Sequence, residues 1–142
     1  MAKQRMMSVS LEEARRVIAA AEQKAQKINQ PSNIAVVDAG ANLVAFVRMD
    51  GAWLGSIDIA QNKAFTARAF DIETEKLAKL SQPKDQFFGI QNSNHGRVMI
   101  FAGGIPLKRD GVVVGAIGVS GGMGEQDQAV AEAGAQVFDS EA

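Results

Sequence analysis

Two pairs of apolar, β-branched segments, each pair joined by a short turn, set the strongest constraint on how this chain can fold. Residues 33–38 and 43–49 flank Ala-Gly-Ala-Asn, and residues 105–108 and 112–119 flank Arg-Asp-Gly. Gly, Asn and Asp-Gly between such runs are typical of hairpin turns, because they tolerate the left-handed backbone that these turns need. Both pairs therefore predict hairpins, and the sheet is expected to be mainly antiparallel.

Helical periodicity precedes, separates and follows these hairpins. Ser10 and Glu13 have the spacing of a capping box, and apolar residues recur at three- and four-residue spacing after them, which predicts an amphipathic helix over 10–28. Further elements are predicted as helices over 56–70, 71–80 and 125–138 and as a strand over 97–101. The resulting order, with helices before, between and after the strands, indicates an α/β (α+β) fold in which helices cover both faces of a five-stranded sheet.

Length and composition favour one globular domain. The chain has 142 residues, of which 46% are hydrophobic and 22% are charged. We expect a single domain over 10–142 after an N-terminal tail over 1–9. The net charge of -1 leaves no basic excess to bind a phosphate backbone, so nucleic acid is not expected as a partner.

The missing residue types exclude several chemistries. Cysteine is absent, which removes disulfides, thiolate metal ligands and cysteine nucleophiles, and the single histidine excludes sites that need two imidazoles from one chain. No metal site is predicted. No apolar run approaches the roughly 18 residues that cross a bilayer, and no signal peptide is evident, so we expect a cytoplasmic protein without membrane association.

Two titratable side chains are candidates for a site. Lys63 belongs to the Ala-rich helix predicted over 56–70, where it is either buried with a lowered pKa or part of a solvated helix face. His95 lies in a polar loop, Gln-Asn-Ser-Asn-His-Gly, and is an axial haem ligand, a general base or a surface side chain.

Two glycine pairs are further candidates. Gly103 and Gly104 precede Ile-Pro and indicate positive φ angles or close backbone approach at a turn lined by ligand. Gly121 and Gly122, after Ser120, either leave backbone amides facing an anion at a helix N-terminus or allow a helix or a second subunit to pack closely. The hairpin predicted over 105–119 places both turns at the same end of the sheet.

A pocket is therefore predicted at this end of the sheet. Its expected walls are the turn from Gly103 to Pro106, the turn from Ser120 to Gly122 and the helix that carries Lys63. The glycines do not indicate a nucleotide-phosphate site, because the strand before them is hairpin-paired and the lysine of a P-loop is absent.

Arg48 is a candidate on the first hairpin. It lies between Asp38 and Asp50 in the sequence, near the hairpin ends. An Arg between two carboxylates forms either a structural ion-pair lock or a clamp for the carboxylate of a ligand.

Six blocks of sequence resemble the GlcG/HbpS family of small bacterial haem-binding-protein-like domains. They are DAGANL at 38–43, RMDG at 48–51, DIAQNKA at 58–64, GGIPL at 103–107, GAIGVSGG at 115–122 and Asp127. The C-terminal domain of PduO-type corrinoid adenosyltransferases belongs to the same group. The resemblance implies a profilin-like fold with five antiparallel strands, and homo-oligomers, commonly dimers assembled into octamers. The apolar stripe over 10–28 also favours assembly, because a 15.0 kDa domain has a limited core in which to bury it.

Two hypotheses for the function follow. The first is a binding protein for haem or a related tetrapyrrole, accessory to a catabolic or cofactor-maintenance pathway, with His95, Lys63 or a methionine as the iron ligand. The second is a small enzyme that acts on a carboxylated metabolite. In it, Arg48 or the amides of Gly121 and Gly122 hold the anion, and Lys63 or His95 is the acid-base group.

Overall fold

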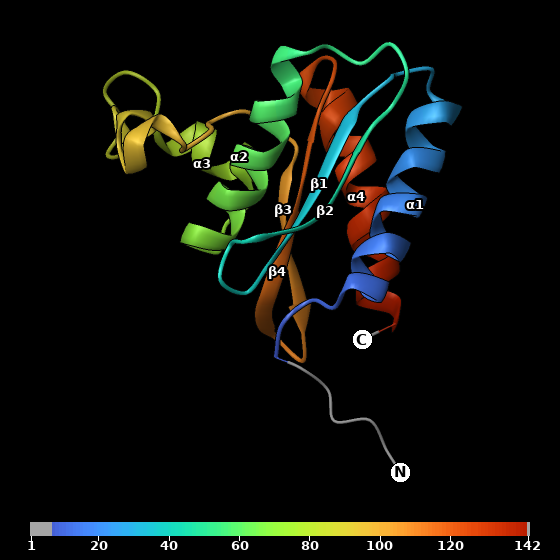
Figure 1. Cartoon of the computed structure of the whole chain (residues 1–142). Helices are drawn as coiled ribbons and strands as arrows, with labels where there is room; N and C mark the ends of the chain where they lie inside the picture. The colour runs from blue at the N-terminus through green and yellow to red at the C-terminus, as the bar shows by residue number, and fades with distance from the viewer. Residues whose placement is uncertain (1–6, 142) are drawn as a thin grey trace.

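An antiparallel sheet lies between two layers of helices in the computed structural model, which describes residues 7–141 (Figure 1). Its elements are α1 (Leu11–Lys27), β1 (Asn33–Asp38), β2 (Leu43–Arg48), α2 (Gly55–Phe70), α3 (Thr74–Leu80), the 3₁₀ turns η1 (Ile90–Asn92) and η2 (Asn94–Gly96), β3 (Gly104–Arg109), β4 (Val112–Ser120) and α4 (Gly124–Glu141). The four helices predicted from periodicity are all present, with ends that move by a few residues.

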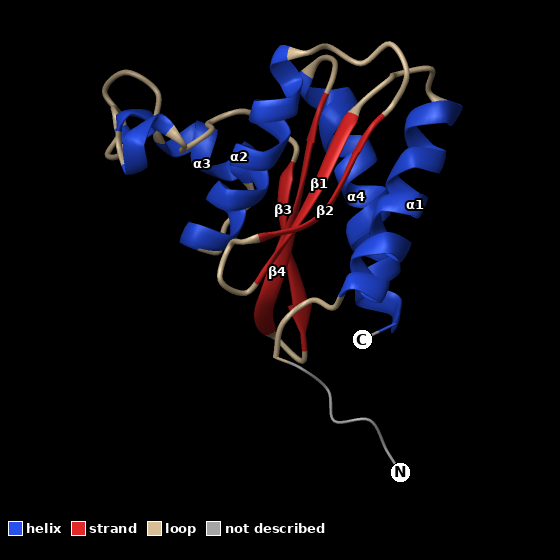
Figure 2. Ribbon diagram, in the orientation of Figure 1, coloured by secondary structure: helices blue, strands red, loops and turns tan. Residues whose placement is uncertain are grey.

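The strand order is β2-β1-β4-β3, and every neighbouring pair is antiparallel (Figure 2). Both predicted hairpins are therefore confirmed. Asn33 at the start of β1 pairs with Arg48 on β2 and with Ser120 on β4. This register places the start of β1 beside the end of β4, where the candidate site lies.

Each face of the sheet is covered by a different helical layer. Ile34 and Val36 belong to the core cluster that includes α1 and α4, whereas Ala35 and Val37 belong to the cluster formed with α2. The second cluster is rich in alanine, so α2 approaches the sheet closely. At Gly118 a Cβ atom would lie 2.5 Å from the backbone nitrogen of α2 residue 64. Helices on both faces were predicted, and the structure confirms them.

The prediction of five strands is wrong, because the described residues form four. The segment 97–101 is not a strand, although Val98 is 1% exposed. The backbone N–H of Met99 donates to Thr66 Oγ1 on α2 at 2.9 Å, so this segment is anchored to a helix instead of the sheet. Val98 is the buried apolar residue of this segment, whereas Phe101 is 57% exposed. β3, which contains Pro106 and so lacks one N–H, remains an edge strand.

Most of the apolar stripe of α1 is covered within the chain, although Leu11 at its start is 46% exposed. Its buried residues are Ala14, Val17, Ile18, Ala21 and Ala25, which join the core cluster with α4. The covered part of the stripe needs no second chain to bury it, and assembly stays a prediction. The core also includes Val9, one residue before the predicted domain start, because its N–H donates to the carbonyl of Val114 at 3.0 Å. Ser8, also in the predicted tail, accepts a hydrogen bond from the Ala39 N–H at 3.0 Å, and residues 1–6 of that tail lie outside the described residues.

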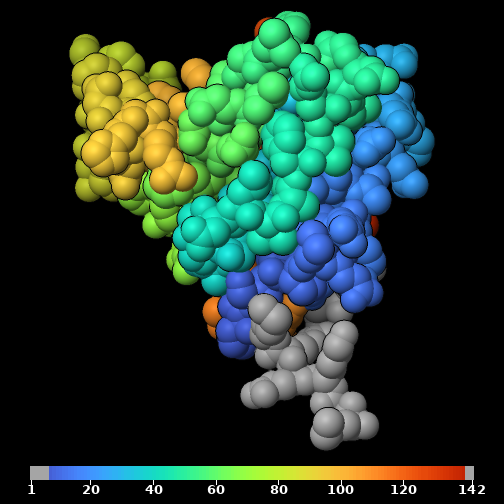
Figure 3. All heavy atoms as spheres, in the orientation of Figure 1, coloured from blue at the N-terminus to red at the C-terminus, as the bar shows by residue number. Residues whose placement is uncertain are grey.

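Residues 81–97 form a lobe that projects from the body beside α2 (Figure 3). The lobe contains η1 and η2 and is mostly exposed. Across residues 7–141, no helix combines the length and apolarity that a membrane span requires.

Candidate functional site

A cavity of about 570 Å³ opens at the end of β4. It lies between α2, α3, the segment 100–102 and the start of α4, and most of its wall is apolar. Trp53, Phe101 and Met123 line it and are 63%, 57% and 68% exposed, so they form its mouth. Exposed large apolar side chains around a concave site are typical of a surface that binds a ligand or a partner.

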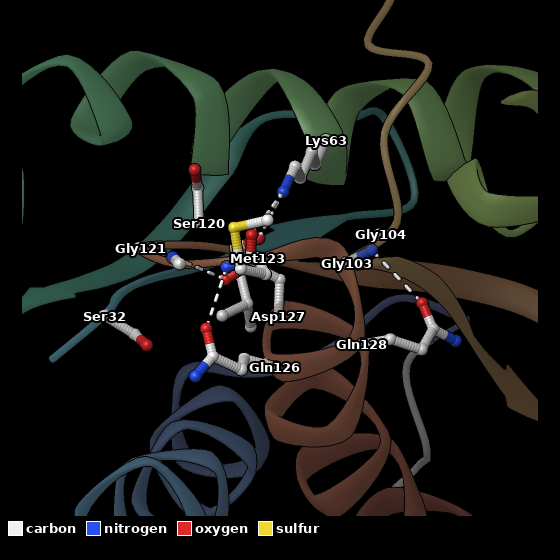
Figure 4. A network of polar contacts seen from close by, with 12 residues as sticks. Ser32, Lys63, Gly103, Gly104, Ser120, Gly121, Met123, Gln126, Asp127 and Gln128 are labelled. Atoms are coloured by element: carbon white, nitrogen blue, oxygen red, sulfur yellow. Dashed lines mark hydrogen bonds and ion pairs between the residues drawn. The ribbon is translucent and has the colours of Figure 1, made fainter. Parts of the chain in front are cut away.

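A buried ion pair forms the floor of this cavity. Lys63 Nζ on α2 lies 3.0 Å from Asp127 Oδ2 on α4 and 2.9 Å from the carbonyl oxygen of Val119 (Figure 4). The two charged side chains are only 2% and 4% exposed. Lys63 therefore reaches past the end of β4 and connects the helical layers on the two faces of the sheet.

Two glycines provide the space for Lys63. Gly103 has a φ of 122°, and a Cβ there would lie 3.1 Å from both Lys63 Nζ and Asp127 Cβ. At Gly104 a Cβ would lie 2.6 Å from the Lys63 carbonyl oxygen. The sequence predicted positive φ or close approach at this pair, and the structure shows positive φ at the first glycine and close approach at both.

Burial acts on the two partners in opposite directions. It lowers the pKa of Lys63, although the charge and hydrogen bond of Asp127 oppose this effect. It raises the pKa of Asp127, which Lys63 and the N–H groups of Gly122 and Gly121 oppose. Because the two pKa values move toward each other, burial reduces the free energy needed to transfer a proton from the ammonium group to the carboxylate. Of the two possibilities left open by the sequence, Lys63 is the buried lysine and not part of a solvated face.

Asp127 also anchors the turn that precedes α4. Its Oδ1 accepts from the N–H of Gly122 at 3.0 Å, and the N–H of Met123 donates to Gln126 Oε1 at 2.8 Å (Figure 4). The amides of Gly121 and Gly122, which were expected to face an external anion, are therefore directed to the carboxylate of Asp127. The other interpretation of this turn was close packing. Gly121 supports it, because a Cβ there would lie 2.8 Å from Ser32 Cα.

Three predicted site residues lie away from this cavity. His95 is exposed in η2, on the projecting lobe. Pro106 on β3 lines a separate pocket of about 250 Å³ together with Lys108 and Asp139. Arg48 is exposed at the end of β2. Ser120, Gly122 and Lys63 do line the cavity, and Gly103 contacts its floor.

The expected cluster of Arg48 with Asp38 is not formed. The register pairs Arg48 with Asn33 at one end of the hairpin, whereas Asp38 lies at the turn. There the Oδ1 atom of Asp38 accepts from the N–H groups of Gly40 and Asn42 at 2.9 and 3.0 Å. Asp38 therefore stabilises the turn, because its carboxylate satisfies two loop amides.

Sequence reasoning missed the residues that complete the site. Asp127 lies 64 positions after Lys63, and no local spacing connects the two. The family resemblance already included Asp127 as one of its six blocks, but no role in the site was predicted for it. Its place in the first turn of a helix after Gly-Gly was a second signal, since a carboxylate there complements the helix dipole. Within residues 7–141, no group of three or more acidic or histidine side chains is arranged to hold a metal ion.

Comparison with known proteins identifies the class to which this fold and site belong. The model of the HbpS-like family, described as haem degrading protein HbpS-like, matches residues 9–136. An uncharacterized 15.0 kDa protein from the dhaT-dhaS intergenic region of Citrobacter freundii is 40% identical over 135 residues, 95% of each chain. The chain belongs to the HbpS-like family.

Longer relatives and solved structures agree with this assignment. The corrinoid adenosyltransferase PduO of Citrobacter freundii is 36% identical over 126 residues, which are 89% of this chain and 38% of that enzyme. The crystal structure of Klebsiella pneumoniae ORFY is similar with a TM-score of 0.92 and 37% identity, covering 98% of this chain and 96% of the other. A complex of PduOC with haem has a TM-score of 0.88 and 33% identity, covering 92% and 95%.

Proposed function

We propose that this chain binds haem or a related tetrapyrrole in the cavity at the end of β4. The observation that carries the proposal is the apolar cavity of about 570 Å³ with Trp53, Phe101 and Met123 at its mouth. Membership of the HbpS-like family supports it, as does the haem complex of the PduOC relative. A large aromatic ligand gains most of its binding free energy from apolar contacts of this kind.

The residues of the cavity fit such a ligand. Met123 offers a thioether sulfur at the mouth, whereas His95 is on the lobe and Lys63 is held by Asp127. Exposed Lys79 on the rim offers a positive charge for ligand carboxylates. Met123 would therefore supply the protein ligand to the iron, and haem bound there would supply a redox-active centre.

The likeness to part of a longer enzyme supports an accessory role in a catabolic or cofactor-maintenance pathway. The chain aligns with 38% of a corrinoid adenosyltransferase. The name of that enzyme indicates that it acts on a corrinoid, which is another tetrapyrrole-like cofactor. The alternative, an enzyme for a carboxylated metabolite, has less support. Asp127 already neutralises Lys63 and accepts the Gly122 amide, so the floor offers no free positive charge for an anion.

The test is an absorption titration with haemin. The wild type is expected to show a Soret shift that saturates at a fixed stoichiometry. Ala78→Phe fills the cavity from α3 and should weaken binding by about tenfold or more, which corresponds to about 1.4 kcal/mol. Ala19→Phe places the same side chain on exposed α1, away from the cavity, and should leave binding unchanged.

The iron ligand is tested separately. Met123→Ala should alter the position of the Soret band, because the coordination changes while the apolar walls remain. Equal haemin binding by the wild type and Ala78→Phe would place the ligand elsewhere on the molecule, and a diffuse, unsaturable Soret change would contradict specific binding altogether.

A further inference from the structure

We propose that Lys63 forms a Schiff base with a neutral aldehyde or ketone that enters the cavity, and that Asp127 is its proton-transfer partner. This activity goes beyond haem binding and does not depend on it. It rests on the position of one amine at the floor of an apolar cavity, in contact with one buried carboxylate.

The geometry selects Lys63 among the amines of the cavity. Its side chain lines the floor and is 2% exposed, whereas Lys79 is exposed on the rim. Two of its N–H groups donate to the Val119 carbonyl and to Asp127 Oδ2. The third has no hydrogen-bond partner among the residues that the structure describes, so the ammonium group is not fully enclosed by acceptors.

The carboxylate allows the amine to react. Asp127 Oδ2, 3.0 Å away, accepts one proton from the ammonium group, and rotation about the Cε–Nζ bond turns the resulting lone pair toward the cavity. Burial lowers the pKa of Lys63 and raises the pKa of Asp127, which favours this transfer. A lysine whose pKa burial lowers is the usual nucleophile of Schiff-base chemistry.

The reaction balances without any further reagent. The Nζ lone pair attacks the carbonyl carbon, and the amine proton moves to the oxygen to give a carbinolamine. Protonated Asp127 then donates its proton to the hydroxyl group, water leaves, and an iminium ion remains beside a carboxylate. The starting ammonium and carboxylate and the final iminium and carboxylate have the same total charge, and no electrons are gained or lost.

The surroundings indicate the class of carbonyl compound. Because Lys63 and Asp127 neutralise each other and the amide of Gly122 is occupied, the floor does not favour an anionic group. The apolar walls, with Phe101 and Met123 at the mouth, fit an aromatic or aliphatic body. The floor itself, where Lys63 and Asp127 are 2% and 4% exposed, is shielded from water, which favours the loss of water that forms the imine.

The experiment traps the adduct. The full chain is incubated with benzaldehyde and sodium cyanoborohydride, which reduces an iminium ion to a stable secondary amine, and is analysed by intact mass and peptide mapping. One benzyl group per chain, located on Lys63, is the expected result. If the label is spread over exposed lysines and Lys63 is unmodified, the proposal is overturned. The wild-type protein alone is sufficient for this test.

Matched variants identify the chemistry. Lys63→Arg keeps the positive charge but cannot form an imine, so it should lose the adduct, whereas Lys27→Arg at the exposed end of α1, outside the cavity lining, should retain it. Asp127→Asn should slow trapping by about a hundredfold, as expected for loss of a proton-transfer group. If Asp127→Asn folds and is labelled at the wild-type rate, the assigned role of the carboxylate is wrong.

The outcome is independent of haem. Failure of the haemin titration leaves the trapping result unchanged, since benzaldehyde is small and needs only the floor. If both ligands bind, haemin added first should reduce labelling of Lys63, because both occupy the same cavity.

Discussion

At the scale of single residues, Lys63 and Asp127 dominate the energetics of the site. Each is almost fully buried, and each satisfies the charge of the other at 3.0 Å. A buried ion pair gives little net stability, but the loss of one partner leaves an uncompensated charge in a poorly solvated place. The pair is therefore sensitive to substitution on either side.

Asp127→Asn is expected to lower the free energy of unfolding by about 3 kcal/mol, because Lys63 loses its counter-charge. Asn retains an oxygen that can accept from the Gly122 N–H, so the substitution tests mainly the charge. Glu12→Gln, which removes an exposed pair with Arg16 at 2.9 Å, is the control and should change stability by less than about 1 kcal/mol. Denaturant unfolding measures both, and equal effects would contradict the prediction.

Glu13 gives a prediction for pH. It accepts hydrogen bonds from Arg109 and from the Ser10 N–H. Burial raises its pKa, but these bonds and the charge of Arg109 outweigh burial and leave the pKa below the ordinary 4.5. Because the folded-state pKa is below the unfolded one, the stabilisation is present above pH 4.5 and is lost as the pH falls below that value.

The change to test this is Glu13→Gln, which keeps the capping geometry. It should lower stability at pH 7 and flatten the decrease in the free energy of unfolding between pH 5 and pH 3. Urea unfolding at several pH values measures the slope, and parallel curves for the two proteins would exclude a contribution from Glu13.

At the scale of elements, local sequence was sufficient for the helices and hairpins but not for the segment 97–101. The turn residues and apolar periods that define α1 or the β3–β4 hairpin are neighbours in sequence. The burial of Val98 depends on α2, which only the tertiary structure brings close. The floor of the site likewise could not be predicted from local sequence, because Lys63 and Asp127 are brought together only by packing across the end of the sheet.

The contact between α2 and β4 is tested by Gly118→Ala. A Cβ there would lie 2.5 Å from the backbone nitrogen of residue 64, so α2 must move away from the sheet. We expect a loss of about 2 kcal/mol in the free energy of unfolding, typical of overpacking. Haemin binding should weaken as well, because α2 forms one wall of the cavity.

A glycine at the start of the same helix provides the control. A Cβ at Gly55 would meet nothing within 4 Å, so Gly55→Ala should be neutral or slightly stabilising. If the two alanine variants unfold at the same denaturant concentration, close packing at Gly118 does not limit stability.

At the scale of the whole molecule, the arrangement of apolar surface bears on assembly. Most of the α1 stripe is covered by α4, but Phe87 and Phe88 of the projecting lobe are 40% and 60% exposed. The family resemblance implies dimers that assemble into octamers. Because the structure contains a single chain, the oligomeric state stays a prediction.

We expect a dimer or larger assembly at micromolar concentration, because isolated chains would leave these aromatic side chains in water. Light scattering coupled to size-exclusion chromatography gives the mass directly, and a dilution series separates weak from stable association. A mass of 15.0 kDa at every concentration would contradict the expectation.

The double use of Asp127 has a consequence for how such a protein can diversify. The carboxylate that lines the floor also holds the start of α4, so the floor cannot be altered without a cost in folding. Trp53, Phe101 and Met123 are exposed at the mouth, where substitutions usually change stability by about 0.5 kcal/mol or less. Evolution, or a library of variants, can therefore change which ligand binds by substituting residues at the mouth, while the fold beneath the mouth stays the same.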